Sequence, residues 1–362
     1  MVFNPFMAGA SNFFKQTRVF YDMQKEFMNN VRHLLPTNFQ SSDMTVLHPD
    51  PVDVGTWERS VFTAPENTTK QFVNELAYYT FIPSIADDKQ QAKHRGMVVM
   101  LHGCDQNASV FAQGTQMNLY AQKHGFIVLY PQQNKRHNFA QCWRWYNLDS
   151  DSGMAEVNTI MELISRTIKK YKIDSNNVFV AGMSAGAGMA NAIAFSFPEK
   201  ITAVALHSGP VFGQARDVRS GLTVMGGLIN ESDEELTSFL KTFSKPKPHD
   251  IPTLIIHGAK DPVVNISNAT ALSKQALYLN DLPLDTKATV TRHNPDTPHA
   301  YTQKVYYHQK MPIVKVMEVD EMAHEWAGGD TSLPFNTDNG PNSSETILKF
   351  FSNYVTRPVE KK

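Results

Sequence analysis

The sequence has little cysteine, no long apolar run and no excess of charge of one sign. Its 362 residues include 2 cysteines, which excludes a disulfide-rich scaffold and a zinc finger built from cysteines. No stretch approaches the roughly 18–20 consecutive apolar residues of a membrane-spanning helix. Lys and Arg total 34 against 35 Asp and Glu, a formal net charge of −1. The chain therefore lacks the basic surface of a nucleic-acid-binding protein.

What is present is typical of a folded globular protein, with 41 % hydrophobic and 10 % aromatic residues. The N-terminal stretch MVFNPFMAGASNFFKQ does not resemble a secretory signal, because Asn, Gly, Ser and Gln interrupt its apolar residues. We therefore expect a cytoplasmic location.

The N-terminal region carries a helical pattern. Large apolar residues recur every seven positions at Phe13, Phe20, Phe27 and Leu34. This spacing predicts an amphipathic helix over 11–34, ended by Pro36, in an N-terminal extension of residues 1–40. Its apolar face packs against the rest of the chain or, alternatively, contacts a partner, a lipid surface or a polymer granule. The polar, turn-rich residues 41–70 are expected to form a connector, and residues 71–357 the main domain.

Within the main domain, short β-branched runs alternate with helical patterns. The expected strands are 72–82, 97–101, 126–130, 178–181, 203–206, 253–256 and 313–319. The expected helices are 110–124, 155–171, 184–197, 266–279 and 343–354. Apolar runs of this length are typical of parallel strands that are buried on both faces. The alternation predicts an α/β fold, a mostly parallel sheet with helices on both faces.

The segment Gly182–Gly186 matches the motif G-x-S-x-G, in which a serine lies on a sharp turn between a strand and a helix. An apolar strand precedes it and the helical segment AGAGMANAIAF follows it. We interpret Ser184 as a nucleophile. The alternative is a glycine-rich helix start that serves close packing alone.

A serine nucleophile needs a base, and the base needs an orienting carboxylate. In this type of fold they follow the serine in the order carboxylate, histidine. Asp261 follows the strand 253–256, and His324 lies between the last strand and the last helix. We predict that Asp261 orients the base and that His324 is the base. A solvated turn aspartate and a buried structural histidine are the alternatives.

The developing negative charge on the substrate needs two backbone N–H groups, one of them from the residue after the serine, Ala185. The second is expected from Cys104, in the loop that follows the strand 97–101. A cysteine nucleophile is the alternative role of Cys104. The histidines lack a metal-ligand spacing and no phosphate-binding glycine loop is present, so we expect neither a metal nor a cofactor.

Six segments resemble the polyhydroxybutyrate depolymerase family of esterases over about residues 70–355. They are LHGCDQNASVFAQGTQMN, HGFIVLYPQQN, QCWRWYN, VFVAGMSAGAGMANAIA, HGAKDPVV and MAHEWAGG, in this order. The resemblance implies an α/β-hydrolase fold, a catalytic triad of Ser184, Asp261 and His324, and oxyanion amides from Cys104 and Ala185. It also implies cleavage of short-chain hydroxyalkanoate polyesters or their oligomers. A soluble esterase for small, acetyl or feruloyl esters is the alternative, and a non-catalytic granule-binding protein is a third reading.

The resemblance also bears on the two cysteines and on the nearby aromatic residues. Cys104 and Cys142 both follow strands at one edge of the predicted sheet, and either a disulfide or two free buried thiols fits that placement. The aromatic residues that we expect to line an apolar substrate cleft at this edge are Trp143, Trp145, Tyr146 and Trp326. Core packing is the alternative for each of them.

Overall fold

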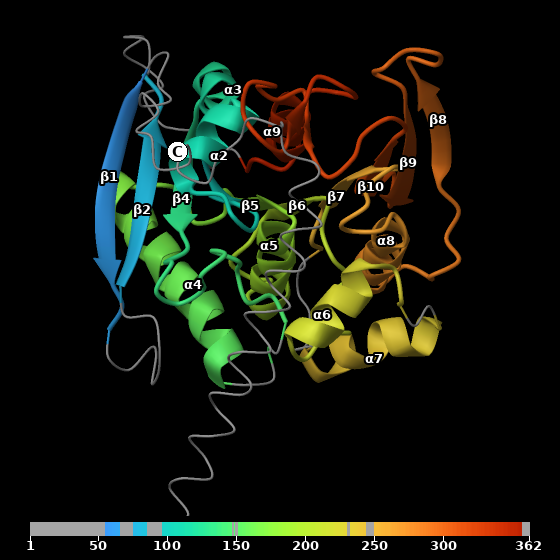
Figure 1. Cartoon of the computed structure of the whole chain (residues 1–362), viewed down its shortest axis with the longest axis horizontal. Coiled ribbons are helices and arrows are strands. Elements are labelled where there is room, and N and C mark those ends of the chain that lie inside the picture. The colour runs from blue at the N-terminus through green and yellow to red at the C-terminus, as the bar shows by residue number, and fades with distance from the viewer. Residues whose placement is uncertain are drawn as a thin grey trace, which may run out of the picture. The chain divides into compact units, whose positions relative to one another are not determined.

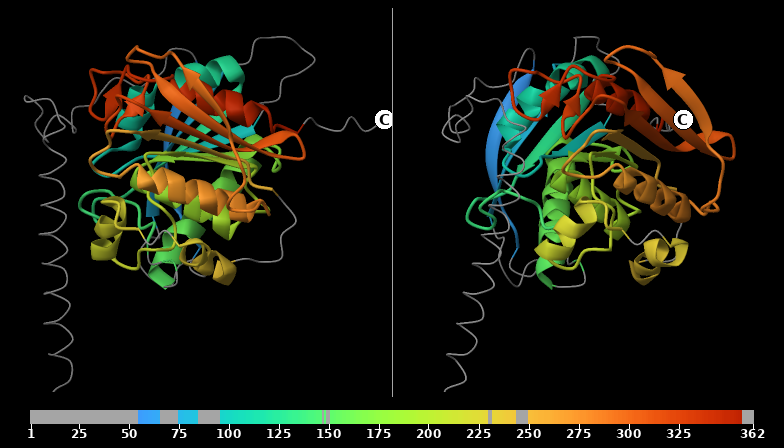
Figure 2. Two further views of the ribbon diagram at one scale, coloured as in Figure 1. Left: turned by 90° about the vertical axis from the view of Figure 1, so that its right-hand side faces the viewer. Right: turned by 45° about the vertical axis from the view of Figure 1, so that its right-hand side comes forward.

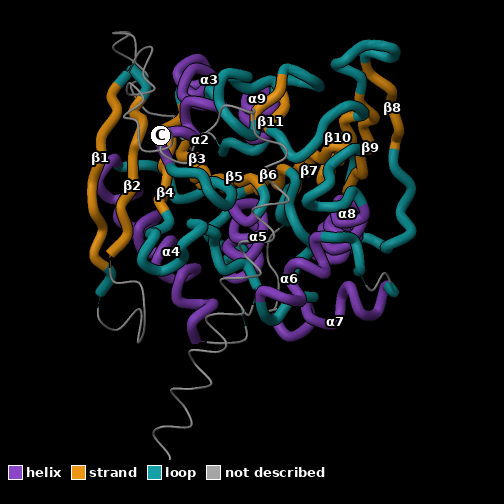
Figure 3. The backbone as a smooth tube through the Cα atoms, in the orientation of Figure 1, coloured by secondary structure: helices purple, strands orange, loops and turns teal. Residues whose placement is uncertain are grey.

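A ten-stranded sheet with the order β1-β2-β4-β3-β5-β6-β7-β10-β9-β8 is the main feature of the computed structural model, which describes residues 55–65, 75–84, 96–146, 148, 151–229, 232–243 and 250–356 (Figure 3). Its strands are β1 (Thr56–Thr63), β2 (Glu75–Ile82), β3 (Gly96–Leu101), β4 (Phe126–Gln132), β5 (Val178–Met183), β6 (Ala203–His207), β7 (Thr253–Gly258), β8 (Thr289–His293), β9 (Tyr301–His308) and β10 (Met311–Val319). A separate short pair joins β11 (Trp326–Ala327) to β12 (Asn336–Thr337).

The centre of the large sheet is parallel and its margins are antiparallel. Strands β4, β3, β5, β6, β7 and β10 pair in parallel, whereas β1 and β2 on one side and β9 and β8 on the other pair antiparallel. All residues of β3, β5, β6 and β7 are buried. The arrangement confirms the predicted α/β-hydrolase fold.

Helices cover both faces of this sheet (Figure 1). The helices are α2 (Ala108–Thr115), α3 (Met117–His124), α4 (Asp151–Tyr171), α5 (Ala185–Ser196), α6 (Val218–Met225), α7 (Asp233–Phe243), α8 (Ser267–Leu279) and α9 (Ser343–Ser352). Helices α2, α3 and α9 lie on one side of the sheet and α4, α5 and α8 on the other, as the turned views also show (Figure 2). None of the helices that the structure describes combines the length and the apolar character that a membrane span requires.

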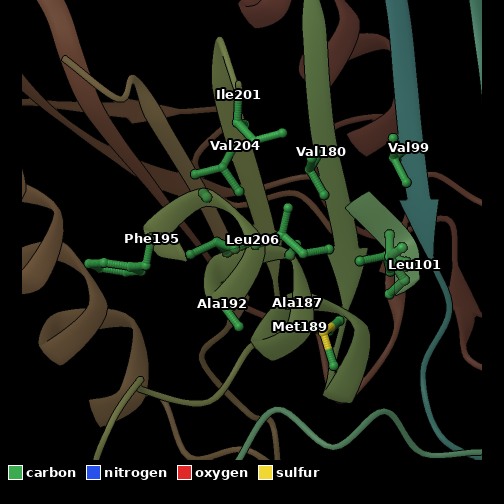
Figure 4. Close-up of a cluster of buried hydrophobic side chains, with 14 of the residues drawn as sticks. Val99, Leu101, Val180, Ala187, Met189, Ala192, Phe195, Ile201, Val204 and Leu206 are labelled. Atoms are coloured by element: carbon green, nitrogen blue, oxygen red, sulfur yellow. The ribbon is translucent and has the colours of Figure 1, made fainter. Parts of the chain in front are cut away.

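Alternation along the strands supplies both layers of the core. In β3, Val98 and Met100 pack with residues of α2, α3 and α9, whereas Val99 and Leu101 pack with residues of α4, α5 and α8. Figure 4 shows the second of these layers, with Leu206 of β6 among the side chains of α5. Because helices cover both apolar faces of the central strands, these strands are buried along their whole length, and the connecting loops lie at the two ends of the strands.

The predicted connector contains a strand. Residues 56–63 form β1, which pairs with β2 along its whole length, so the domain boundary predicted at residue 71 was placed too late. Among the described strands β1 lies at the edge of the sheet, and apart from Phe62 its side chains are exposed or half-buried, including Arg59 and Glu58, which gives it the polar character of a connector. The helix predicted over 11–34 lies outside the described residues.

The helix predicted over 110–124 is two helices, α2 and α3. They are separated at Gln116, whose left-handed backbone (φ 53°) ends one helix and begins the next. Strands β8 and β9 and helices α6 and α7 were not predicted. The exposed residues of β8 lack an apolar run by which a buried strand is recognised.

Candidate active site

Ser184 lies on the turn between β5 and α5. Its backbone angles, φ 56° and ψ −124°, are rare for any residue with a side chain. Two hydrogen bonds hold this conformation: the N–H of Ser184 donates to the carbonyl oxygen of His207 (2.9 Å), and the N–H of Gly188 donates to the carbonyl oxygen of Ser184 (3.0 Å). A strained turn of this kind presents a side chain at the end of a strand.

The two glycines of the motif allow the turn to form. A Cβ atom on Gly182 would lie 2.3 Å from the carbonyl oxygen of Gly186, and one on Gly186 would lie 2.0 Å from that of Leu101. Both distances are far below contact distance, so only glycine lets α5 begin this close to β5 and β3. The same two glycines therefore allow both the close packing of α5 and the strained turn that carries Ser184.

Asp261 follows β7 and its side chain is buried. Its Oδ1 atom accepts hydrogen bonds from the N–H groups of Val263 (2.9 Å) and Val264 (2.8 Å), while its Oδ2 atom lies 2.8 Å from Nδ1 of His324. Burial acts to raise the pKa of Asp261, but the charge and hydrogen bond of His324 outweigh it and the pKa lies below its ordinary value. The carboxylate is therefore ionised at neutral pH.

His324 lies in the loop after β10 and is nearly buried. Since an ionised carboxylate only accepts hydrogen bonds, Nδ1 of His324 carries the proton and donates it to Asp261, which leaves Nε2 as an acceptor. Among the described residues no hydrogen bond joins Nε2 to Ser184. Such bonds are often long in the absence of substrate. The structure thus brings Asp261 and His324 into contact, and Ser184 follows β5 at the same edge of the parallel sheet.

Gly258 brings the loops of Asp261 and His324 together. A Cβ atom on this glycine would lie 2.2 Å from the carbonyl oxygen of Met322 and 2.6 Å from that of Ala323. The N–H of Lys260 also donates to the carbonyl oxygen of Met322 (3.2 Å). Any side chain at position 258 must push the two loops apart.

We therefore expect Gly258→Ala to destabilise the protein by about 1–3 kcal/mol, as forced overpacking does, and to lower the melting temperature by several degrees. Gly221→Ala is the matched control. Gly221 lies in helix α6, and a Cβ atom there would meet only the rings of Trp145 and Tyr146, at ordinary contact distances of 3.5 Å or more. Alanine is the better helix former, so this control should be neutral or slightly stabilising. Equal melting temperatures of the two variants in a thermal scan would contradict the packing argument.

The loop after β3 approaches Ser184 at Gly103, where a Cβ atom would lie 3.4 Å from Cβ of Ser184. The N–H of Gly103 donates to Oε1 of Gln106 (2.8 Å). The neighbouring ring of His102 accepts from the N–H of Gln133 at Nε2 (3.1 Å) and donates from Nδ1 to the carbonyl oxygen of Gly103 (2.8 Å). Burial lowers the pKa of His102 to about 4, so the ring is neutral and both bonds persist at neutral pH.

Cys104 and Ala185, the predicted oxyanion residues, border Ser184 on these two segments. The N–H groups of both residues donate no hydrogen bond to any residue that the structure describes. Since an unpaired amide is costly to bury, two free donors beside one serine are consistent with a site for a negatively charged oxygen.

The sulfur atoms of Cys104 and Cys142 form a disulfide, with the Cα atoms 4.3 Å apart. Next to it the N–H of Asp105 donates to the carbonyl oxygen of Ala140 (2.6 Å). The loop after β3 is thus tied to the loop after β4. A bonded cysteine has no thiolate, which removes the alternative of Cys104 as nucleophile. Disulfides persist in oxidising compartments, so this pairing does not support the cytoplasmic location expected from the N-terminal residues.

Three of the four predicted cleft aromatics are core residues. The side chains of Trp143, Trp145 and Trp326 are 1 %, 4 % and 0 % exposed, so they do not line an open surface. Trp145 packs on α5, where a Cβ atom on Gly188 would lie 2.6 Å from its ring atoms. Burial of such large rings is favoured because it removes a large apolar surface from water and so stabilises the folded state. Only Tyr146 keeps a partly exposed side chain.

Three buried histidines surround the site and were not singled out from the sequence. They are His102 just after β3, His207 at the end of β6 and His257 within β7. Nε2 of His257 donates to the carbonyl oxygen of Val264 (2.7 Å), which closes the turn that holds Asp261. Their positions could have been found from the sequence, because each histidine lies at or just after the carboxyl end of a predicted parallel strand, the same sheet edge that carries Ser184.

The family model described as esterase PHB depolymerase matches residues 76–299. The chain belongs to this family. A poly(3-hydroxyalkanoate) depolymerase C of Paucimonas lemoignei is 26 % identical over 63 % of this chain and 54 % of its own length. A probable acetylxylan esterase A of Aspergillus clavatus is 33 % identical over 38 % of this chain and 43 % of its own. The chain thus spans about half the length of these two relatives.

Two further comparisons cover more of the molecule. Feruloyl esterase B of Thermothelomyces thermophilus is 28 % identical over 64 % of this chain and 78 % of its own length. The solved structure of an acetyl xylan esterase from Aspergillus awamori matches 82 % of this chain and 99 % of its own with a TM-score of 0.64 at 19 % identity. At 19 % identity this structural match shows that the two proteins share a fold, and it shows nothing about the substrate.

Proposed function

We propose that the protein is a carboxylic ester hydrolase with Ser184 as nucleophile, His324 as general base and Asp261 as the residue that orients it. The observation that carries the proposal is the 2.8 Å hydrogen bond between the buried Asp261 and His324. It lies at the sheet edge that also carries the strained turn of Ser184. A base with a fixed tautomer at the same sheet edge as a serine on a strained turn is the arrangement that serine esterases require.

The proposed reaction has two halves. Nε2 of His324 accepts the proton of Ser184 Oγ as this oxygen attacks the ester carbonyl, and the N–H groups of Cys104 and Ala185 stabilise the resulting oxyanion. The alcohol leaves with the proton from His324, and an acyl group remains on Ser184. Water, deprotonated by His324, then releases the acid and restores the serine. Asp261 stabilises the imidazolium that forms in each half.

For the substrate we propose a short-chain hydroxyalkanoate polyester or its oligomers. The family match and the depolymerase of Paucimonas lemoignei support this class. Contact with a polymer granule through the helix predicted over 11–34 is part of the same proposal. The second candidate is a soluble acetyl or feruloyl esterase, which the names of the other relatives favour.

A chromogenic short-chain ester tests the reaction. Mixed with enzyme in stopped flow, it should release a burst of about one chromophore per active site followed by slower turnover, because an activated ester acylates the serine faster than water removes the acyl group. Absence of turnover with any ester would contradict the proposal. Amorphous polyhydroxybutyrate, hydroxybutyrate oligomers, acetylated xylan and a feruloyl ester, compared by kcat/KM, then identify the substrate class. A preference for the last two would favour the second candidate.

A further inference from the structure

His207 occupies a position that touches both halves of the proposed machinery. It is the last residue of β6 and its side chain is buried. Its carbonyl oxygen accepts the hydrogen bond from the N–H of Ser184 (2.9 Å), which holds the strained turn. Its ring extends to a different segment, the loop that carries His324.

The ring of His207 makes three kinds of contact with that loop and its surroundings. It stacks on the ring of Trp326, with centroids 4.6 Å apart and planes at 17°. Its Nε2 atom lies 3.1 Å from Oγ of Ser343, the first residue of α9, and 3.5 Å from the N–H of Ala327. Its Nδ1 atom lies 3.2 Å from Oγ of Ser208. Every polar atom of the ring therefore has a partner.

These contacts define the protonation of the ring. Since the N–H of Ala327 donates to Nε2, this nitrogen accepts, and Nδ1 carries the proton that is donated to Ser208. Burial lowers the pKa of His207 to about 3, and the neighbouring His257 and His324 act in the same direction while Asp261 opposes them. The ring is neutral throughout the working range, so it serves as a fixed contact and not as an acid or base.

Trp326 transmits the contact to the base, because it follows His324 by two residues. Its ring is fixed on its other sides by Phe111, whose ring lies edge-on at 5.6 Å, and by Ser344, whose Oγ accepts from Nε1 (3.2 Å). Ser344 in turn donates to the carbonyl oxygen of Thr115 (2.6 Å). The segment after His324 is thus clamped between β6, α2 and α9, while Gly258 confines the segment before it.

We propose that His207 is a positioning residue that fixes the distance between Ser184 and His324, with its backbone on the serine turn and its ring on the loop of the base. The inference rests on the proposed function. It follows from geometry, because one residue contacts both segments, the serine turn through a hydrogen bond and the loop of the base through a ring stack. Misplacement of catalytic groups by about 1 Å can reduce a rate about 100-fold.

The test replaces the imidazole ring of His207 by a ring that has no nitrogen atoms. His207→Phe keeps the stack on Trp326 and removes the contacts to Ser343, Ala327 and Ser208. We expect kcat per active site for a short-chain ester to fall about 10- to 100-fold, with KM changed less than about twofold. Irreversible phosphonylation of Ser184, taken to completion, counts the correctly folded sites, so a variant that merely folds less well would lose titratable sites while kcat per site stays unchanged. That result would overturn the inference.

His293→Phe is the matched control. The ring of His293 stacks on Tyr301 at 4.6 Å and 11°, a similar contact between β8 and β9. This variant should keep kcat per site. A loss as large as that of His207→Phe would show a general effect of replacing stacked histidines and would also overturn the inference.

Ser343→Ala removes one partner of the ring and keeps the test decisive if His207→Phe does not fold. We expect a smaller, several-fold decrease in kcat per site. In the double variant the loss should equal that of His207→Phe alone, because both changes break the same contact. Unchanged kcat per site in Ser343→Ala alone would contradict the role of this contact, and where His207→Phe folds, a double variant that multiplies the two single losses would contradict it as well. Failure of the wild type to hydrolyse any ester would instead contradict the proposed function, so the two failures are distinguishable.

Discussion

Replacement of Ser184 by alanine should lower the turnover of a short-chain ester by about 10⁴–10⁶-fold, because the attacking oxygen is lost. The fold should be unaffected. Alanine has the same Cβ atom as serine in the strained turn, and both backbone hydrogen bonds of residue 184 remain. The measurement is steady-state turnover of a chromogenic ester, together with a thermal scan that verifies an unchanged melting temperature.

Ser196→Ala is the control for this variant. Ser196 ends helix α5, the helix that Ser184 precedes, and its buried Oγ has no hydrogen-bond partner among the described residues. Its removal should therefore leave the rate unchanged. A Ser184→Ala enzyme that retains a tenth of the wild-type rate would disprove the assignment of the nucleophile. Adding His324→Ala should lower the residual rate little further, since the residues act as a unit.

Asp261→Asn should reduce kcat by about 10⁴-fold, through the tautomer of His324. An asparagine can keep Oδ1 on the N–H groups of Val263 and Val264, which turns its NH₂ group toward Nδ1 of His324. Nδ1 must then accept a hydrogen bond, so the proton moves to Nε2. A protonated Nε2 cannot take the proton of Ser184, and the rate falls although the geometry is preserved.

Asp285→Asn, an exposed carboxylate after α8, is the control for Asp261→Asn and should keep the wild-type rate. The pH dependence of the wild type gives a second measurement. The pKa of Asp261 is below its ordinary value, so this group stays ionised as the pH is lowered. The fall of kcat/KM in acid should therefore report protonation of the imidazole. A flat profile over roughly pH 5 to 9 would argue against a histidine base, provided that chemistry limits turnover.

The linear sequence contained enough information for the parallel sheet and for the positions of Ser184, Asp261 and His324. Each of these residues follows a short apolar strand. The carboxyl ends of parallel strands meet at one edge, so their order along the chain predicts proximity in space. The glycines at 182, 186 and 258 belong to the same local information, since they permit the close approach of the segments that the structure brings together.

Only the tertiary structure decided which side chains at that edge face solvent and which segments pair. Trp143, Trp145 and Trp326 were expected to line an apolar cleft, yet each is covered by groups far away in the sequence. His207 and Phe111 cover the ring of Trp326, helix α5 covers that of Trp145, and His102 covers that of Trp143. Tertiary structure also decides the fate of β1, whose polar sequence forms a strand because it pairs with the backbone of β2. Burial and pairing depend on what lies opposite in space, and periodicity in a single segment carries no information about that partner.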